Sequence, residues 1–258
     1  ISQRLSGEEF GNLRVGINAA LTNLTPEFIL EDAIADYLKT MKLFKDIGDY
    51  YDVNISCPNT QEGEPFVDKQ NLNALLTAIN KEIRPISEKP IYVKLAADMT
   101  IDEINIIVDA CVEHKMDGVV CTNLAKPQYN TEHIPEEYPT VDGRLPEGKG
   151  AMSGLPLQRI STNVIRHVYR RTRGKLTIIG VGGIFSAKDA YEKITSGASL
   201  CHMITAMIFD GPQSMSEINR GLVKLLKADG FNSISEAVGS RNPLPKERTD
   251  KLQKPRAA

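Results

Sequence analysis

Apolar residues along the chain occur in two alternating patterns. Short continuous apolar runs, which are typical of buried strands, cover residues 13–17, 51–55, 91–95, 118–122, 177–181 and 200–207. Longer stretches, in which apolar residues recur every three or four positions, predict helices over residues 25–44, 72–83, 100–114, 157–170, 186–195 and 214–228. Six consecutive strand-then-helix units imply parallel strands joined by helical crossovers, and therefore an α/β fold.

The starts of three predicted helices carry residues suited to capping. Thr25 is a predicted N-cap. Thr100 and Glu103 match a capping box, and Ser186 with Asp189 forms a second such pair. These pairs support the helix boundaries that the apolar spacing indicates.

Two architectures place their sites at the carboxyl ends of parallel strands, namely the doubly wound open sheet and the (β/α)8 barrel. An open sheet concentrates its site at one switch point, whereas a barrel recruits nearly all of its strands. Polar or glycine residues lie at almost every predicted strand end here: Asn18, 54–60, Lys94, Thr122, Asn123, Gly182, Gly183 and Thr205. This distribution favours the (β/α)8 barrel, with two further units expected before Ile1.

Two segments interrupt the regular alternation. Residues 124–150 form a long insertion rich in proline, glycine and glutamate, which we expect either to close over the site or to be a surface insertion without a catalytic part. Residues 241–258 are charged, contain proline and have almost no large apolar side chains, so we expect a disordered tail. Residues 1–240 then form the barrel domain.

Composition excludes several classes of function. The chain has 258 residues, a net charge of -2 and a pI near 6.2, which gives no basic field for nucleic acid. It has no apolar run long enough for a membrane span and no secretory signal pattern. Its four cysteines and four histidines lack metal-site or disulfide spacing, which fits a reducing cytosol and predicts no metal.

Glycine-rich turns near the end of the chain suggest a phosphate site. Gly182 and Gly183 follow a predicted strand, and Ser153 with Gly154 precedes a predicted helix. Backbone N–H groups at such turns, together with a helix dipole, bind phosphate, and glycine allows close approach. The alternative is that these glycines only form turns.

A lysine, a cysteine and three amides are the other candidates for chemistry. Lys94 lies within an apolar strand, where it either faces a polar cavity and stabilises an anionic ring or extends to solvent. Cys57 precedes a proline, and an unperturbed thiol has a pKa of about 8.5, so it can serve as a base or nucleophile. Asn54, Asn59 and Asn123 together would suit a planar, uncharged ring, although any one of them could be only a turn residue.

Six motifs occur in order over most of the chain: VNISCPNT (53–60), IYVKLAAD (91–98), VVCTN (119–123), SGLPL (153–157), IIGVGGI (178–184) and GASLCHMITAMIF (197–209). Together they resemble the dihydroorotate dehydrogenases, which are FMN-dependent (β/α)8 barrels of pyrimidine (UMP) biosynthesis. In that family a base removes the C5 proton of dihydroorotate while the C6 hydride passes to flavin N5, which gives orotate.

The resemblance implies roles for individual residues. Cys57 matches the catalytic base, and Lys94 the lysine beside the flavin N1/O2 edge that stabilises the reduced, anionic flavin. The residues implied in substrate binding are Asn54, Asn59, Thr60 and Asn123. The residues implied in FMN binding are Asn18, Asn54, Lys94, Thr122, Ser153, Gly154, Gly182, Gly183, Ile204 and Thr205.

The chain combines features of two classes within this family. GASLCHMITAMIFDGP and FNSISEAVG (231–239) resemble the membrane-associated class that uses a quinone, but that class usually has serine as its base. Cys57 is typical of the soluble class, which uses fumarate or NAD. Leu124 and Ile204 also stand where the quinone class usually has a small hydroxyl residue and a tyrosine. The resemblance implies a quinone acceptor, with fumarate or NAD as alternatives, and a cytoplasmic protein that can lie on the inner face of the cell membrane.

Three other functions remain open from the sequence. One is a related flavin enzyme, such as the pyrimidine-reducing domain of dihydropyrimidine dehydrogenase or a tRNA dihydrouridine synthase, although near-neutral charge disfavours tRNA binding. Another is a phosphate-binding barrel isomerase without redox chemistry, which would share Gly182 and Gly183 but has no need for Cys57 and Lys94. The third is a truncated, non-catalytic scaffold.

Overall fold

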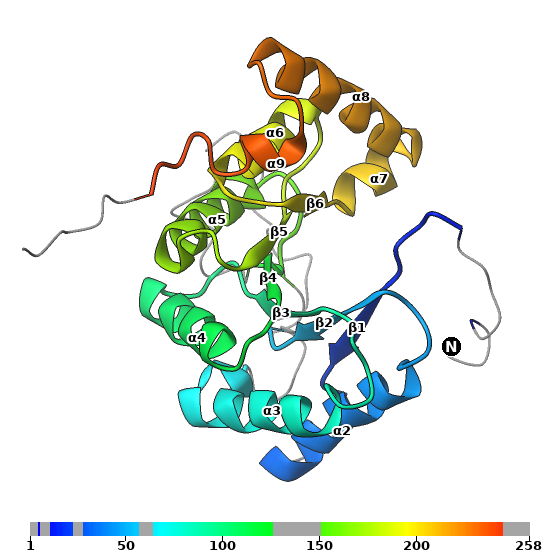
Figure 1. Cartoon of the computed structure of the whole chain (residues 1–258), viewed down its shortest axis with the longest axis vertical. Helices are drawn as coiled ribbons and strands as arrows, with labels where there is room; N and C mark the ends of the chain where they lie inside the picture. Colours follow the sequence, from blue (N-terminus) through cyan, green and yellow to red (C-terminus); the bar gives the residue numbers. More distant parts are fainter. Residues whose placement is uncertain (1–4, 6–10, 23–27, 57–63, 126–150, 245–258) are drawn as a thin grey trace, which may run out of the picture.

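The computed structural model describes residues 5, 11–22, 28–56, 64–125 and 151–244. Its sheet has six parallel strands whose spatial order follows the chain order (Figure 1). The strands are β1 (Gly16–Ala20), β2 (Tyr50–Asn54), β3 (Ile91–Leu95), β4 (Gly118–Cys121), β5 (Thr177–Val181) and β6 (Leu200–His202). A doubly wound sheet would reverse its strand order at a switch point, whereas this sequential order is that of a barrel wall. The structure therefore confirms the predicted barrel architecture for these six units.

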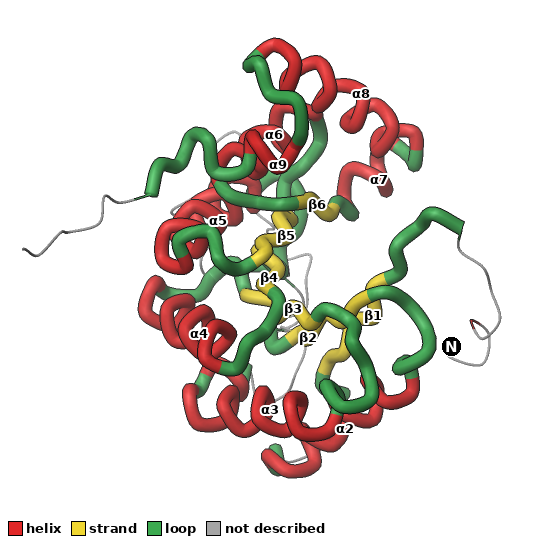
Figure 2. Tube along the Cα trace, viewed as in Figure 1, coloured by secondary structure: helices red, strands yellow, loops and turns green. Residues whose placement is uncertain are grey.

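From α2 to α6 the helices alternate with the strands and lie along the outer side of the curved sheet, and three more helices follow β6 (Figure 2). They are α2 (Leu30–Leu43), α3 (Lys69–Glu82), α4 (Ile101–Glu113), α5 (Leu157–Thr172), α6 (Ala187–Ser196), α7 (Thr205–Asp210), α8 (Gln213–Ala228) and α9 (Ile234–Ala237), with a short 3-10 turn η1 (Pro65–Val67). None of the helices in the described residues is long and apolar enough to cross a membrane.

Along each strand, successive side chains point alternately to the outer core and to the inner face of the sheet. Tyr51 and Val53 of β2 are fully buried in the core between the sheet and the outer helices. Asp52 and Asn54 therefore face the opposite, inner side of the curved sheet. The same rule places Lys94 on the inner side, because both of its neighbours on β3 belong to the outer core. The inner face is thus the polar face of the sheet.

Both predicted capping boxes are confirmed. The Thr100 hydroxyl accepts from the Glu103 backbone N–H at 3.3 Å, and the Glu103 carboxylate accepts from the Thr100 N–H at 2.7 Å. Ser186 and Asp189 pair in the same way at the start of α6. Asp68, which the sequence analysis did not identify, caps α3.

Several predicted boundaries were wrong. The first strand begins at Gly16 rather than at residue 13, and the first long helix begins at Leu30. The N-cap of that helix is Ile29, while Thr25 lies outside the described residues. The apolar run 200–207 is a strand only over its first three residues and then turns into α7.

The predicted tail also begins too early. The Asn242 side chain is fully buried and donates to the backbone oxygens of Arg166 (3.0 Å) and Ser196 (2.8 Å). Arg241 pairs with Asp229 at 2.8 Å. Residues 241–244 are therefore part of the packed domain, and residues 245–258 lie outside the described residues.

A buried lysine joins two outer helices. The Lys193 side chain on α6 is fully buried, and its amino group donates to three oxygens of α5: the Gln158 carbonyl at 3.2 Å, the Thr162 hydroxyl at 3.1 Å and the Ser161 hydroxyl. Burial lowers the pKa of Lys193 from 10.5 to about 8, because the charged form loses its hydration.

We expect this shift to make stability depend on pH. Between the folded pKa and the unfolded one, the unfolded chain holds a proton that the folded chain has released, so stability rises with pH from about 8 to about 10.5. Relative to a Lys193→Met variant, the wild-type unfolding free energy should increase by about 2–3 kcal/mol across this range. Urea unfolding of both proteins at several pH values measures the difference. A difference that stays constant with pH would contradict the assignment.

Candidate functional site

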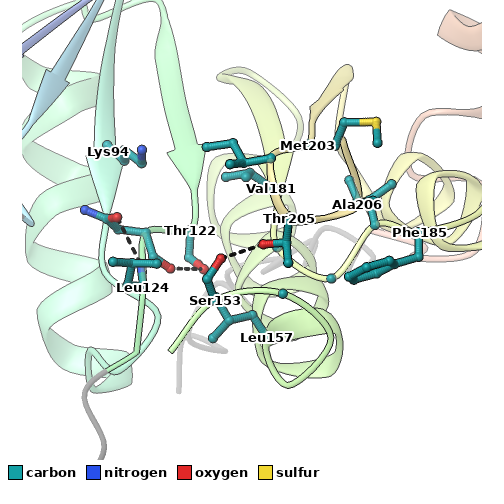
Figure 3. Close-up of a pocket in the computed structure, with 16 residues that line it drawn as sticks. Lys94, Thr122, Leu124, Ser153, Leu157, Val181, Phe185, Met203, Thr205 and Ala206 are labelled. Atoms are coloured by element: carbon teal, nitrogen blue, oxygen red, sulfur yellow. Dashed lines mark hydrogen bonds between the residues drawn. The ribbon is translucent and has the colours of Figure 1, made fainter. Parts of the chain in front are cut away.

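A pocket lies at the carboxyl ends of β3 to β6 (Figure 3). It brings together nine residues that the sequence analysis selected: Lys94, Thr122, Asn123, Ser153, Gly154, Gly182, Gly183, Ile204 and Thr205. Asn54 lies beside it through a hydrogen bond to Asn123. Asn18 lies on β1, two strands away from Lys94. Cys57, Asn59 and Thr60 lie outside the described residues.

One end of the pocket combines hydroxyl groups with glycine turns. The Ser153 and Thr205 hydroxyl oxygens are 2.8 Å apart, which joins the segment before α5 to the start of α7. Gly154 has a φ of +83°, and an added Cβ there would lie 3.0 Å from the Thr205 methyl carbon. Hydroxyl groups and closely approached backbone amides are groups that bind phosphate oxygens.

Gly183 is fixed by both its conformation and its neighbours. Its φ is +68°, and an added Cβ would lie 2.5 Å from the Cα atom and 2.6 Å from the backbone nitrogen of Gln158. Any side chain at this position would push β5 and α5 apart at the pocket. The glycine pair thus has a packing role as well as the one expected in phosphate binding.

We expect Gly183→Ala to destabilise the protein more than Gly230→Ala. Gly230 has a similar φ of +80° but nothing within 4 Å of an added Cβ, so it isolates the backbone cost. That cost is about 1 kcal/mol, and overpacking at Gly183 should add about 1–3 kcal/mol. Urea unfolding measures the unfolding free energy of each variant. Equal decreases in the two variants would show that the structure relaxes easily around the added methyl group beside Gln158.

The helix that borders the glycine turn differs from the expected one. The first turn of α6 is closed by its own capping box of Ser186 and Asp189. The first residues of α7, Thr205 and Ala206, line the pocket instead, and the N-cap Ile204 makes no side-chain cap bond. α7 could not be recognised in the sequence, because it begins shortly after an apolar strand and continues the same apolar run.

A cluster of amides and one hydroxyl joins the ends of β2, β3 and β4. Asn123 Nδ2 donates to the Asn54 side-chain oxygen (3.1 Å) and to the Ser56 carbonyl (2.7 Å). The buried Ser56 hydroxyl donates to the Lys94 carbonyl at 3.0 Å. These bonds occupy the Asn54 oxygen and leave its Nδ2 group as the donor for a ligand. Ser56 lies inside VNISCPNT, and only its small size and position after a strand marked it in the sequence.

Lys94 supplies the positive charge of the pocket. Its side chain is half-buried, and no described residue makes a hydrogen bond or an ion pair with its amino group. Its charge nevertheless reaches two groups on the inner face. It counteracts the burial that raises the pKa of Asp52, and it adds to the burial that lowers the pKa of His202. A cation at the edge of a pocket, without a partner in the described part of the chain, suits an anionic ligand.

Burial disfavours the thiolate form of the cysteines within the described residues. Cys111 and Cys121 are fully buried, and burial raises the pKa of both thiols, that of Cys111 to about 12. Burial also raises the pKa of Cys201 to about 12. This agrees with the packing role that the sequence predicted for these three. The described residues also contain no group of three side chains suited to a metal ion.

The two ends of the pocket differ in their chemistry. Hydroxyls and glycine turns at one end fit a phosphate, and Lys94 with the amide cluster at the other fits a polar ring that carries negative charge. This donor set suits FMN, which combines both chemistries. Most of this set could be predicted from the sequence. Asp52, which does not line the pocket but faces the same inner side of the sheet, was not predicted, although its charge within an apolar strand is the same signal that drew attention to Lys94.

Comparisons with known proteins identify the family of the chain. The family model described as "Dihydroorotate dehydrogenase" matches residues 4–226. Proteins named "Dihydroorotate dehydrogenase (quinone)" from Trichodesmium erythraeum and Nostoc punctiforme are each 40% identical, over 88% and 87% of this chain. Two crystal structures of DHODH from Eimeria tenella, one ligand-free and one in complex with ferulenol, superpose with TM-scores of 0.80 and 0.78 at 26% identity.

These matches cover nearly all of this chain but only part of its relatives. The two structural superpositions span 94% and 93% of this chain, and 68% and 65% of the solved chains. The chain spans 58% of the length of the two curated relatives. Because the family model covers most of the chain, and the fold agrees with the solved relatives, the chain belongs to the dihydroorotate dehydrogenase family.

Proposed function

We propose that this protein oxidises dihydroorotate to orotate in pyrimidine biosynthesis, with FMN as its cofactor. The observation that supports this most strongly is the pocket that joins Lys94, whose amino group has no partner among the described residues, to the hydroxyls of Ser153 and Thr205 and the glycine turns. The names of the relatives support the same reaction.

The residues of the pocket would divide the binding of FMN between them. Ser153, Gly154, Gly182, Gly183 and Thr205 would hold the phosphate, with a backbone contact from Ile204. Lys94, Thr122 and Asn18 would contact the ring. When bound, FMN supplies the hydride acceptor at N5. Lys94 places positive charge where negative charge develops on the ring.

The chain itself would supply the base and the substrate contacts. Cys57 would take the C5 proton of dihydroorotate as the C5=C6 double bond of orotate forms, and bound FMN would supply the acceptor for the C6 hydride. Asn54, Asn59, Thr60 and Asn123 orient the pyrimidine ring. The bond from Asn123 to the Asn54 oxygen supports this role, because it leaves an N–H donor of Asn54 for a substrate carbonyl.

We infer a quinone as the electron acceptor, because the named relatives are quinone enzymes. Cys57 in place of serine keeps fumarate and NAD as alternatives. A quinone acceptor would bring the protein to the inner face of the cell membrane as a peripheral protein. Turnover with a soluble quinone analogue, but not with fumarate or NAD, would support a quinone as the acceptor. Turnover with fumarate or NAD, but not with the quinone analogue, would contradict it.

Binding of FMN compared with riboflavin tests the cofactor proposal. Riboflavin has the same ring but lacks the phosphate, so the cradle should make FMN bind at least about tenfold more tightly. Titration of the purified protein, followed by quenching of flavin fluorescence, measures both affinities. Equal affinities for FMN and riboflavin would show that the protein does not bind the phosphate group. If neither ligand binds, the proposal that FMN is the cofactor is rejected.

A further inference from the structure

A buried carboxylate on the inner face of the sheet has no part in the proposed function. Asp52 lies in the middle of β2, and its side chain is only 8% exposed. One carboxylate oxygen, Oδ2, accepts a hydrogen bond from Asn18 Nδ2 at 2.8 Å. The other, Oδ1, is buried and has no hydrogen-bond partner among the described residues. A buried charge with one unpartnered oxygen is costly, so its place here calls for a reason beyond packing.

The backbone register sets Asp52 directly beside Asn18. The two residues are paired across the parallel strands β1 and β2, and both side chains face the inner side. The Asn18 side chain is exposed, whereas Asp52 behind it is not. The arrangement is therefore a buried acceptor that holds an accessible amide.

A carboxylate restricts the amide that it binds to one orientation. An ionised carboxylate can only accept, so the asparagine must turn its NH2 group toward Asp52. The carboxamide oxygen of Asn18 then faces away and can accept a hydrogen bond from a ligand. Burial raises the pKa of Asp52, and the positive charge of Lys94 together with the bond from Asn18 offsets only part of that rise.

We propose that Asp52 is a positioning residue that locks the Asn18 carboxamide with its oxygen available to accept a hydrogen bond from a ring N–H group of the bound cofactor. The inference rests on the proposed function, because it assigns the ligand of Asn18 to FMN. The flavin ring carries one such N–H group, and its other polar ring atoms accept. An amide free to flip would offer its NH2 group equally often and would lose this selectivity.

A double-mutant cycle tests whether Asp52 acts through Asn18. Asp52→Asn keeps the shape of the side chain but can donate as well as accept, so it no longer fixes the amide. We expect Asp52→Asn and Asn18→Ala each to weaken FMN binding by about tenfold, and the double variant to bind no more weakly than Asn18→Ala alone. If the double variant loses FMN affinity by the product of the two single losses, the residues act independently and the proposal is overturned. An unchanged FMN affinity in Asp52→Asn would overturn it as well.

Asp49→Asn is the matched control. Asp49 is also a carboxylate that accepts from a neighbouring segment, at 2.7 Å from the Val15 backbone nitrogen and 2.9 Å from Arg14, but it lies before β2 at the other end of the strand. This variant should lower stability and leave FMN affinity unchanged. A loss of affinity equal to that of Asp52→Asn would show a general structural effect and would also overturn the proposal.

A measurement without cofactor separates this inference from the proposed function. The side-chain NH2 signals of Asn18, assigned by their absence in Asn18→Ala, report the bond to Asp52 in a 15N–1H NMR spectrum. We expect a downfield proton in the wild type that moves upfield in Asp52→Asn. If the wild type takes up no FMN, the proposed function fails. If the Asn18 signals do not change in Asp52→Asn, the positioning role fails, whatever the cofactor result.

Discussion

Cys57→Ala is expected to lower the turnover of dihydroorotate by about 10²-fold or more, which is the scale of losing a general base. The variant should still bind FMN and orotate, because the pocket that would hold the cofactor is built from other residues. Initial rates and flavin titrations on the same preparation measure the two properties. Turnover close to the wild-type rate would reject Cys57 as the base.

Two further variants make this test specific. Cys201→Ala removes a thiol whose pKa burial raises to about 12, so its turnover should not change. Cys57→Ser keeps a proton acceptor, but a hydroxyl is a much weaker acid than a thiol. Its activity should fall, and its pH optimum should move upward. A pH optimum that stays in place would indicate that another group sets the profile.

Lys94→Ala is expected to slow reduction of the bound flavin by about 10²-fold and to lower its reduction potential. Lys94 lines the pocket, has no ion-pair partner among the described residues, and is the cation that would meet the negative charge of the ring. Loss of one preorganised stabilising group commonly costs this much. Rapid-mixing kinetics and a potentiometric titration measure both effects. An unchanged potential would place Lys94 away from the ring.

Lys89→Ala serves as the control for Lys94→Ala. Lys89 lies just before β3, at the opposite end from Lys94, and its amino group donates to the carbonyls of Phe44 (2.6 Å) and Ile47 (2.5 Å). Its loss should reduce stability without changing the flavin potential. A similar fall in the flavin reduction potential in both variants would mean that the position of the lost charge does not matter. Lys94 would then have no specific role beside the ring.

The architecture could be predicted from the sequence because local and global preferences agree. The strands β2, β3, β4 and β5 are fully or almost fully apolar on their outer side, and both capping boxes sit where the helices begin. β1 was misplaced because Leu13 is apolar but 72% exposed, so it extended the apolar run without being part of the core. β6 was overextended because α7 continues the same apolar run, and three of its residues, Met207, Ile208 and Phe209, are exposed.

The site could be predicted less completely than the fold. Lys94 and the glycine turns are visible as residues that break an apolar pattern, and the pocket unites them. The pairing of Asn18 with Asp52, and of Asn123 with Ser56, depends on the register between strands, which spacing along one strand does not reveal. Cys57, Asn59 and Thr60 lie outside the described residues, so the roles expected of them stay predictions.

Anaerobic mixing of the FMN-loaded protein with dihydroorotate tests the central claim most directly. We expect the flavin absorbance to be lost in one turnover, with one orotate formed for each FMN bound. Dithionite, added to a second sample, shows that the bound flavin can be reduced. A protein whose flavin is bleached by dithionite but stays oxidised with excess dihydroorotate would contradict the proposed reaction.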